Sequence, residues 1–135
     1  MEDHLIVLDT DVIIDFFSGT SPGDRVISEL LSHERAILTS ISVFELYAGI
    51  EGRKRIHQIE TLIQNLIILP LDLSGAAIAG RVYTELKVKG QLIGIQDILI
   101  AGICLSNGLP LYTENVSHFS KINRLKIISS KDILE

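Results

Sequence analysis

Residues 5–11, Leu-Ile-Val-Leu-Asp-Thr-Asp, carry the clearest structural signal in the sequence. Four consecutive aliphatic side chains that end at a carboxylate are typical of a short strand buried on both faces, as in a parallel sheet. In open parallel sheets, ligands bind beyond the carboxyl ends of the strands, which makes Asp9 a candidate functional residue. The simpler interpretation is that Asp9 or Thr10 caps the helix that follows.

Short apolar runs alternate with helical patterns along the rest of the chain. Further strands are expected at residues 36–39, 67–69, 111–113 and 126–128, and helices at 11–17, 24–31, 53–66, 74–89 and 96–107. Another helix is expected to run to residue 50, capped by Ser40 or Ser42. This alternation predicts an α/β fold with a mostly parallel sheet. Since no linker rich in Pro, Gly or Ser divides the chain, we expect a single domain over residues 1–135.

The composition is that of a folded protein. Of 135 residues, 47% are hydrophobic and 21% are charged, which excludes a disordered chain. The net charge of −5 is too mild to indicate a particular partner. The single cysteine, Cys104, cannot form an internal disulfide, which fits a reducing compartment. The longest apolar run, residues 98–105, is far shorter than the ~20 residues of a membrane span, so we expect a soluble, cytoplasmic protein with no membrane partner.

Two more carboxylates, Glu45 and Asp97, interrupt apolar surroundings. Glu45 lies in a helix between small and apolar neighbours, either on the rim of that helix or as a partly buried ligand. Asp97 precedes the apolar run and is either an N-cap or a carboxylate that needs a compensating cation. Together with Asp9, these acids come from three separate elements and suit a hard divalent cation such as Mg2+ or Mn2+. Such a metal activates water and stabilises the charge that develops on a phosphodiester.

Around these acids the sequence resembles PIN-domain proteins of the VapC type, which are toxin ribonucleases. The matching segments, in the order and spacing of the family, are residues 8–15, 40–51, 93–101 and 112–119. The resemblance implies a three-layer α/β/α sandwich around the sheet, with an acidic pocket that holds Mg2+ or Mn2+. It also implies an endonuclease that hydrolyses RNA phosphodiesters, a small antitoxin protein as partner, and a homodimer. By position, it assigns the metal-binding and catalytic acids to Asp9, Glu45 and Asp97.

The resemblance also assigns supporting positions. Thr10 matches a hydroxyl beside the first acid, and Thr113 and Asn115 match polar positions of the last motif, where Asn115 would orient a carboxylate or a water. Many VapC-like proteins have a fourth acid where this chain has His118, so a second metal site would be weaker here. Glu114 could supply the missing charge. His118 itself is either a contact for phosphate or metal-bound water, or a surface residue.

Basic residues are expected to guide a polyanion toward an acidic pocket. Lys121 and Arg124 directly follow the last motif, which makes them candidates for contact with RNA. The basic run at residues 53–55 is better interpreted as the solvated start of a helix.

Four aromatic residues fall in the helical segments near the first two acids, namely Phe16, Phe17, Phe44 and Tyr47. Most of them are expected in the core. Phe16 and Phe17 are adjacent, so they cannot both face the same interior, and one of them is expected at the surface for an antitoxin or a second subunit.

Two alternative functions stay open. The run of residues 9–12, Asp-Thr-Asp-Val, also fits haloacid-dehalogenase-like phosphatases, in which the first Asp is phosphorylated. The acidic pair that this class needs does not follow the strand at residues 67–69, and the chain is short for that fold. The other alternative is a PIN fold with weakened catalysis, indicated by His118, that binds RNA or another protein without cleaving it.

Overall fold

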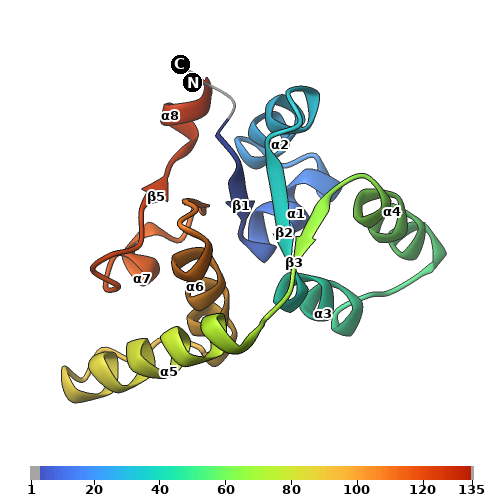
Figure 1. The fold of residues 1–135 in the computed structure, drawn as a ribbon. Coiled ribbons are helices and arrows are strands. Elements are labelled where there is room, and N and C mark those ends of the chain that lie inside the picture. Colours follow the sequence, from blue (N-terminus) through green and yellow to red (C-terminus); the bar gives the residue numbers. More distant parts are fainter. Residues whose placement is uncertain (1–3, 135) are drawn as a thin grey trace.

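Five short strands form one parallel sheet at the centre of the protein (Figure 1). The structure, a computed structural model, describes residues 4–134. The strands are β1 (Ile6–Leu8), β2 (Ala36–Thr39), β3 (Ile67–Leu69), β4 (Leu111–Tyr112) and β5 (Ile127–Ile128). Their order in the sheet is β3-β2-β1-β4-β5, and every pairing among them is parallel, which confirms the predicted sheet.

The first apolar run of the sequence forms the middle strand. All three residues of β1 are fully buried, since β2 and β4 flank it and helices cover both faces of the sheet. At the edge of the sheet, Ile67 of β3 is 55% exposed. Because the strands are parallel, their carboxyl ends lie at the same edge of the sheet. The residues that directly follow β1 and β4, Asp9 and Thr113, therefore lie close together.

Within residues 4–134 the chain forms eight helices. They are α1 (Thr10–Ser18), α2 (Gly23–Ser32), α3 (Ser40–Ala48), α4 (Arg53–Gln64), α5 (Leu73–Val88), α6 (Ile95–Asn107), α7 (Val116–Phe119) and α8 (Ser130–Leu134). The sequence pattern predicts the first six but not α7 or α8, which are too short to produce a helical repeat of apolar residues. None of these helices is both long enough and apolar enough to cross a membrane.

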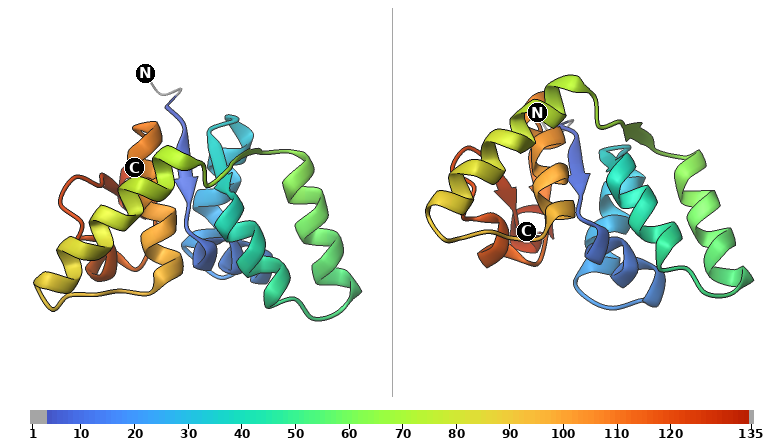
Figure 2. Two further views of the ribbon diagram at one scale, coloured as in Figure 1. Left: turned by 60° about the horizontal axis from the view of Figure 1, so that its bottom comes forward. Right: turned by 90° about the horizontal axis from the view of Figure 1, so that it is seen from below.

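Two apolar cores lie on opposite faces of the sheet. Val7 and Leu111 belong to the core that α5 and α6 cover, whereas Leu8 and Leu38 belong to the core beneath α1, α2 and α4. This division follows from the alternation of side chains along a strand. Figure 2 shows α5 and α6 together on one side of the strands and α1 to α4 on the other. The three-layer α/β/α arrangement is thus confirmed.

The contact between α5 and α6 depends on a glycine. A Cβ atom on Gly102 would lie 2.6 Å from the carbonyl oxygen of Gly75 and 2.7 Å from the Cβ atom of Ala79. Both distances are shorter than van der Waals contact, so only glycine permits this close approach of the two helices. The packing fixes the position of α6, whose first turn carries Asp97.

Two helix starts differ from the predicted ones. The N-cap of α3 is Thr39, whose hydroxyl accepts a hydrogen bond of 3.1 Å from the backbone N–H of Ser42, so the prediction of Ser40 or Ser42 as the cap is wrong. The N-cap of α6 is Gly94. Asp97 is therefore not a cap but lies inside the first turn, where its side chain is free to take part in a site.

The prediction that most of the four aromatic residues lie in the core is wrong for α3. Phe44 is 61% exposed and Tyr47 is 42% exposed, because both lie on the face of α3 that turns away from the sheet. On α1, Phe16 and Phe17 are both half-buried, with their ring centroids 5.9 Å apart. Both rings of the aromatic pair on α1 therefore lie at the edge of the core and are partly exposed at the surface.

Candidate active site at the carboxyl ends of the strands

Asp9 joins β1 to α1 and is almost completely buried, with 4% of its surface exposed. Its Oδ1 atom accepts a hydrogen bond of 2.8 Å from the backbone N–H of Thr10, which makes Asp9 the N-cap of α1. Its Oδ2 atom accepts a hydrogen bond of 2.8 Å from the hydroxyl of Thr113, directly after β4. The two interpretations of Asp9 from the sequence, as a helix cap and as a residue at the ligand-binding edge of the sheet, are therefore compatible.

The electrostatic surroundings of Asp9 oppose its negative charge. The pKa of the Asp9 carboxyl is raised to about 7, mainly by burial and also by the charges of Asp11 and Asp97, although the hydrogen bonds from Thr113 and Thr10 lower it. A buried carboxylate that faces two others is stabilised in its ionised form by a cation. This edge of the sheet thus gathers carboxylates whose negative charges oppose one another.

Glu45 is connected to Asp9 through Thr10. The Thr10 hydroxyl donates a hydrogen bond of 2.5 Å to Oε1 of Glu45, and it also lies 2.8 Å from the hydroxyl oxygen of Ser42. A threonine hydroxyl has one hydrogen and the carboxylate only accepts, so Ser42 is the donor to Thr10. Ser42 is fully buried and Glu45 is half-buried. This chain of hydrogen bonds positions Glu45 on α3, so Glu45 is not simply a residue on the solvated rim of its helix.

Asp97 contacts the last motif rather than Asp9. Its Oδ2 atom lies 3.1 Å from Nδ1 of His118, and the same nitrogen lies 2.9 Å from Nδ2 of Asn115. A single ring nitrogen cannot donate to Asp97 and accept from the Asn115 amide at the same time. When Nδ1 carries a proton it pairs with Asp97, and otherwise it accepts from Asn115. Burial raises the pKa of Asp97 and the charge of Asp11 raises it further, while His118 lowers it.

Thr113 and Asn115 connect the two halves of the site. The backbone N–H of Asn115 donates a hydrogen bond of 2.9 Å to the Thr113 hydroxyl, which itself donates to Asp9. The Glu114 carboxylate turns elsewhere and accepts a hydrogen bond of 2.5 Å from the hydroxyl of Tyr112. The structure thus brings Asp9 and Asp97 to one edge of the sheet through the last motif, whereas Glu114 pairs with a core tyrosine.

The two basic residues predicted to contact RNA lie in different places. Lys121 is half-buried in the turn after α7. Arg124 lines a hollow with Gly108, Pro110 and Lys126, residues that precede β4 and β5. These residues mark the amino ends of the strands, opposite Asp9. Arg124 is therefore not among the residues that the structure brings to the carboxylates.

Sequence reasoning missed two residues of the site. Asp11 is exposed in the first turn of α1, and its charge acts on both Asp9 and Asp97. The sequence feature that could have indicated Asp11 is its position two residues after Asp9. Ser42 lies 32 residues from Thr10, and nothing in the sequence pairs the two hydroxyls. Among residues 4–134, no three His, Cys, Asp or Glu side chains already lie close enough together to hold a metal ion.

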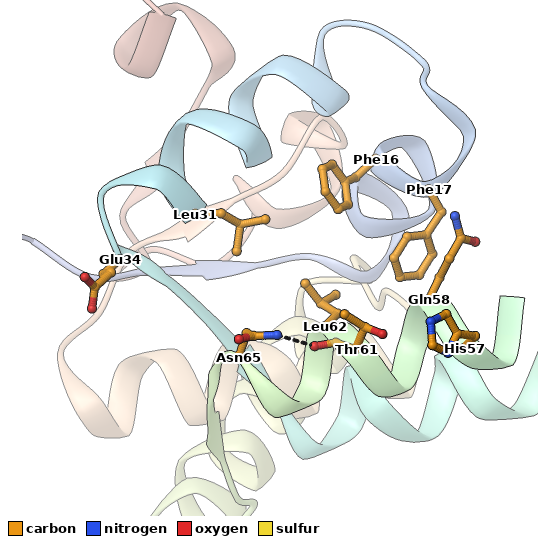
Figure 3. Close-up of a pocket in the computed structure, with 9 residues that line it drawn as sticks. All are labelled: Phe16, Phe17, Leu31, Glu34, His57, Gln58, Thr61, Leu62 and Asn65. Carbon is orange, nitrogen blue, oxygen red and sulfur yellow. Dashed lines mark hydrogen bonds between the residues drawn. The ribbon is translucent and has the colours of Figure 1, made fainter. Parts of the chain in front are cut away.

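One hollow of the protein lies away from these acids. It measures about 720 Å³ and is lined by Phe16, Phe17, Leu31, Glu34, His57, Gln58, Thr61, Leu62 and Asn65, here called the α1–α4 hollow. Figure 3 shows the two phenylalanines of α1 facing the side chains of α4 across it. None of the described residues that line it belongs to the acidic site, so its size alone does not make it the site of chemistry.

Comparison with known proteins identifies the family. A family model described as the PIN domain matches residues 6–125. Ribonuclease VapC1 of Methanocaldococcus jannaschii is 30% identical over 122 residues, which cover 90% of this chain and 83% of that protein. The tRNA(fMet)-specific endonuclease VapC of Salmonella typhimurium is 32% identical over 101 residues, which cover 72% of this chain and 76% of that protein. The chain therefore belongs to the PIN-domain family.

Two of the solved structures that match this chain are VapBC proteins. The crystal structure of DNA-bound VapBC from Salmonella typhimurium contains a chain that matches with a TM-score of 0.82 and 27% identity, over 94% of this chain and 98% of that one. VapBC-1 from nontypeable Haemophilus influenzae matches with a TM-score of 0.79 and 26% identity, over 94% of this chain and 98% of that one. The resemblance to VapC-type PIN domains that the sequence indicated is thus confirmed.

Proposed function

We propose that this chain is a metal-dependent endoribonuclease and the toxin component of a VapBC-type toxin–antitoxin pair. The observation that carries the proposal is the buried Asp9 carboxyl, whose pKa is raised by burial and by the charges of Asp11 and Asp97 at the ligand-binding edge of the sheet. The relatives of this chain include a ribonuclease VapC1 and a tRNA(fMet)-specific endonuclease, which supports RNA as the substrate.

The donor set fits a hard divalent cation. Asp9, Glu45 and Asp97 offer carboxylate oxygens, the ligands that Mg2+ and Mn2+ prefer. When bound, such a cation supplies an activated water and stabilises the negative charge that develops on the phosphodiester. These three acids would hold it, and they are also the catalytic residues of the proposal. Since they do not form a ready-made cluster, the chain's other contribution is to hold each carboxylate in a defined orientation.

Each acid has its own support. Thr113 and the Thr10 N–H hold the two oxygens of Asp9. Ser42 fixes the Thr10 hydroxyl, which in turn holds Glu45. The hydrogen bonds to Asp9 favour its ionised form, and those to both acids fix their rotamers. In the same way, His118 contacts Asp97. His118 adds no carboxylate to the donor set, which favours a site with a single metal ion.

The first test is cleavage of RNA by the protein free of any antitoxin, with added Mn2+ or Mg2+. We expect the wild type to cleave RNA and chelation to stop it. Asp97→Asn should abolish cleavage while the protein stays folded. Asp24→Asn, which removes a half-buried carboxylate on α2, is the matched control and should cleave like the wild type. Full activity of folded Asp97→Asn would refute the assignment. No cleavage by folded, metal-loaded wild type would instead favour a module that binds RNA or protein without cleaving it.

An antitoxin partner is the second part of the proposal. The structural neighbours from Salmonella typhimurium and Haemophilus influenzae are VapBC proteins, which supports a small partner protein for this chain as well. We expect such a partner to inhibit RNA cleavage at a one-to-one ratio. A homodimer follows only from resemblance to the family and stays a prediction, which light scattering of the purified chain tests.

A further inference from the structure

A second hollow opens directly beside Glu45. It measures about 390 Å³ and is lined by Ile14, Phe17, Glu45, Leu46, Gly49, Glu51, Arg55 and Ile59, here called the Glu45 hollow. Its walls come from α1, α3 and α4 and from the turn between α3 and α4. The volume lies in the range of sites that bind small organic groups. Glu45 lines the hollow and also hydrogen-bonds Thr10, so this one acid belongs both to the hollow and to the proposed active site.

The hollow has an apolar floor and an aromatic wall. Leu46 is 5% exposed and Ile59 is 1% exposed, so both belong to the core beneath. Ile14 is 46% exposed, and Phe17 is half-buried. The guanidinium carbon of Arg55 lies 5.2 Å from the centroid of the Phe17 ring, a cation–π contact. A flat, apolar group can thus extend a stack that the Phe17 ring and the Arg55 guanidinium already form.

The charges of the hollow distinguish a base from a phosphate. Glu45 and Glu51 would repel a phosphate group from the interior of the hollow. A smaller hollow of about 150 Å³ adjoins it and is lined by Phe17, Glu51, Lys54, Arg55 and Gln58. Lys54 lines the smaller hollow alone, while Arg55 and Glu51 line both, so the positive charge is concentrated at the smaller hollow. An RNA strand would satisfy both regions with its base inside and its phosphate outside.

We propose that the Glu45 hollow binds one base of the RNA substrate adjacent to the cleaved phosphodiester, with the base held by Phe17 and Arg55. The proposal rests on the proposed ribonuclease function and names a specificity site for it. Unpaired bases of RNA are recognised by stacking on aromatic rings and on arginine guanidinium planes. Phe17 and Arg55 supply both surfaces within reach of an acid that would hold the metal.

The carboxylate of Glu51 adds a preference among bases. A carboxylate only accepts hydrogen bonds. Every base can donate to it, adenine, cytosine and guanine through an exocyclic amino group and uracil through its ring N–H. The carboxylate therefore favours guanine, which presents two neighbouring donors, its ring N–H and its amino group. Glu51→Gln, whose amide also donates, should reduce that preference.

The test uses short oligoribonucleotides with a mapped cleavage site, in which each nucleotide next to that site is replaced in turn by an abasic one. For the wild type, we expect one position at which the abasic substitution lowers kcat/KM by about tenfold, the size expected for one stacked base. Phe17→Leu keeps an apolar side chain but removes the aromatic face. It should lower kcat/KM on the intact substrate by a similar factor and show little further loss on the abasic one.

Phe16→Leu is the matched control, because both phenylalanines line the α1–α4 hollow but only Phe17 lines the Glu45 hollow. It should cleave like the wild type. The proposal is overturned if Phe17→Leu lowers kcat/KM by the same factor on the intact and the abasic substrates. It is likewise overturned if Phe17→Leu and Phe16→Leu have the same kcat/KM. It is also overturned if Phe17→Leu leaves RNA cleavage unchanged and only weakens binding of an inhibitory protein, since the hollow would then be a protein site.

Failure of the ribonuclease function itself has a different signature. In that case the wild type cleaves none of the oligonucleotides with either metal. Equilibrium binding of the same intact and abasic oligonucleotides then tests the hollow without catalysis. A weaker affinity of Phe17→Leu for the intact RNA alone supports a base site, and equal affinities of wild type and Phe17→Leu refute it.

Discussion

The hydroxyl of Thr113 donates a hydrogen bond of 2.8 Å to Oδ2 of Asp9, which lies 104 residues earlier in the chain. The contact exists because β1 and β4 are parallel neighbours, so the residues that follow them meet at one edge of the sheet. Thr113 also accepts from the N–H of Asn115, so its single hydrogen is directed at Asp9. The orientation of the buried carboxylate therefore depends on the last motif.

We expect Thr113→Val to destabilise the metal-free protein at pH 8 by about 1–3 kcal/mol, the cost of removing a donor from a buried charged group. Since the hydrogen bond favours ionised Asp9, the loss should be smaller at pH 5.5, where the carboxyl of Asp9 is protonated. Urea unfolding with chelator present measures both values. Thr113→Ser keeps the hydroxyl and should restore most of the stability. If Thr113→Val and Thr113→Ser lose the same amount of stability, the hydroxyl does not have this role.

The raised pKa of Asp9 makes the metal-free protein less stable as the pH rises. The folded-state pKa of about 7 exceeds the ordinary value of 3.8, so between these values the folded state binds more protons than the unfolded state. Stability then falls from about pH 4 to pH 7 and levels off above it. Asp97 acts in the same direction, since its pKa is raised as well.

The contribution of Asp9 to the stability difference between pH 5 and pH 8 is about 2–3 kcal/mol. Asp9→Asn should remove most of this difference in the presence of chelator. Asp24→Asn, on the surface of α2, should leave it unchanged. The measurement is urea unfolding at both pH values. If the stability of Asp9→Asn still falls steeply between pH 5 and pH 8, other groups cause the pH dependence.

The parts of the fold that the sequence predicts are those with a strong local signal. Leu5 to Leu8 is a continuous aliphatic run, which is typical of a strand buried on both faces. The helix α7 spans four residues, and a segment that short has no apolar repeat to detect. Phe44 and Tyr47 were expected in the core because of their type, but the orientation of α3 exposes them.

In the candidate site, too, some residues have a strong local signal in the sequence and others have none. The carboxylates stand out in the sequence because each interrupts apolar residues. Their partners do not, since the contact between Thr10 and Ser42 spans 32 residues and depends on how α1 and α3 meet. The contact of His118 with Asp97 likewise forms only once α6 and α7 have packed at the same edge of the sheet. Local pattern thus predicts the charged groups, and tertiary structure determines what holds them.

The close approach of α5 and α6 predicts a sharp difference between two glycine substitutions. Gly102→Ala places a methyl group within 2.7 Å of Ala79 and closer still to the Gly75 carbonyl, so it should cost about 1–3 kcal/mol of stability. Gly80→Ala, on the exposed side of α5, has no atom within 4 Å of the added methyl group. It should stabilise the protein by about 0.5–1 kcal/mol through helix propensity. Urea unfolding compares the two, and equal effects would contradict the tight contact.

The chain of hydrogen bonds from Ser42 through Thr10 to Glu45 predicts an effect on metal affinity. Thr10→Val removes the donor that holds Glu45 while it keeps the side-chain volume. Loss of a group that orients a metal ligand typically lowers metal affinity by about 10–100-fold. Thr10→Ser keeps the hydroxyl and should bind Mn2+ nearly as tightly as the wild type. Calorimetric titration with Mn2+ measures the affinity independently of cleavage. If Thr10→Val binds Mn2+ like the wild type, Glu45 is either not a ligand or is not positioned by Thr10, and Glu45→Gln in the same titration decides between the two.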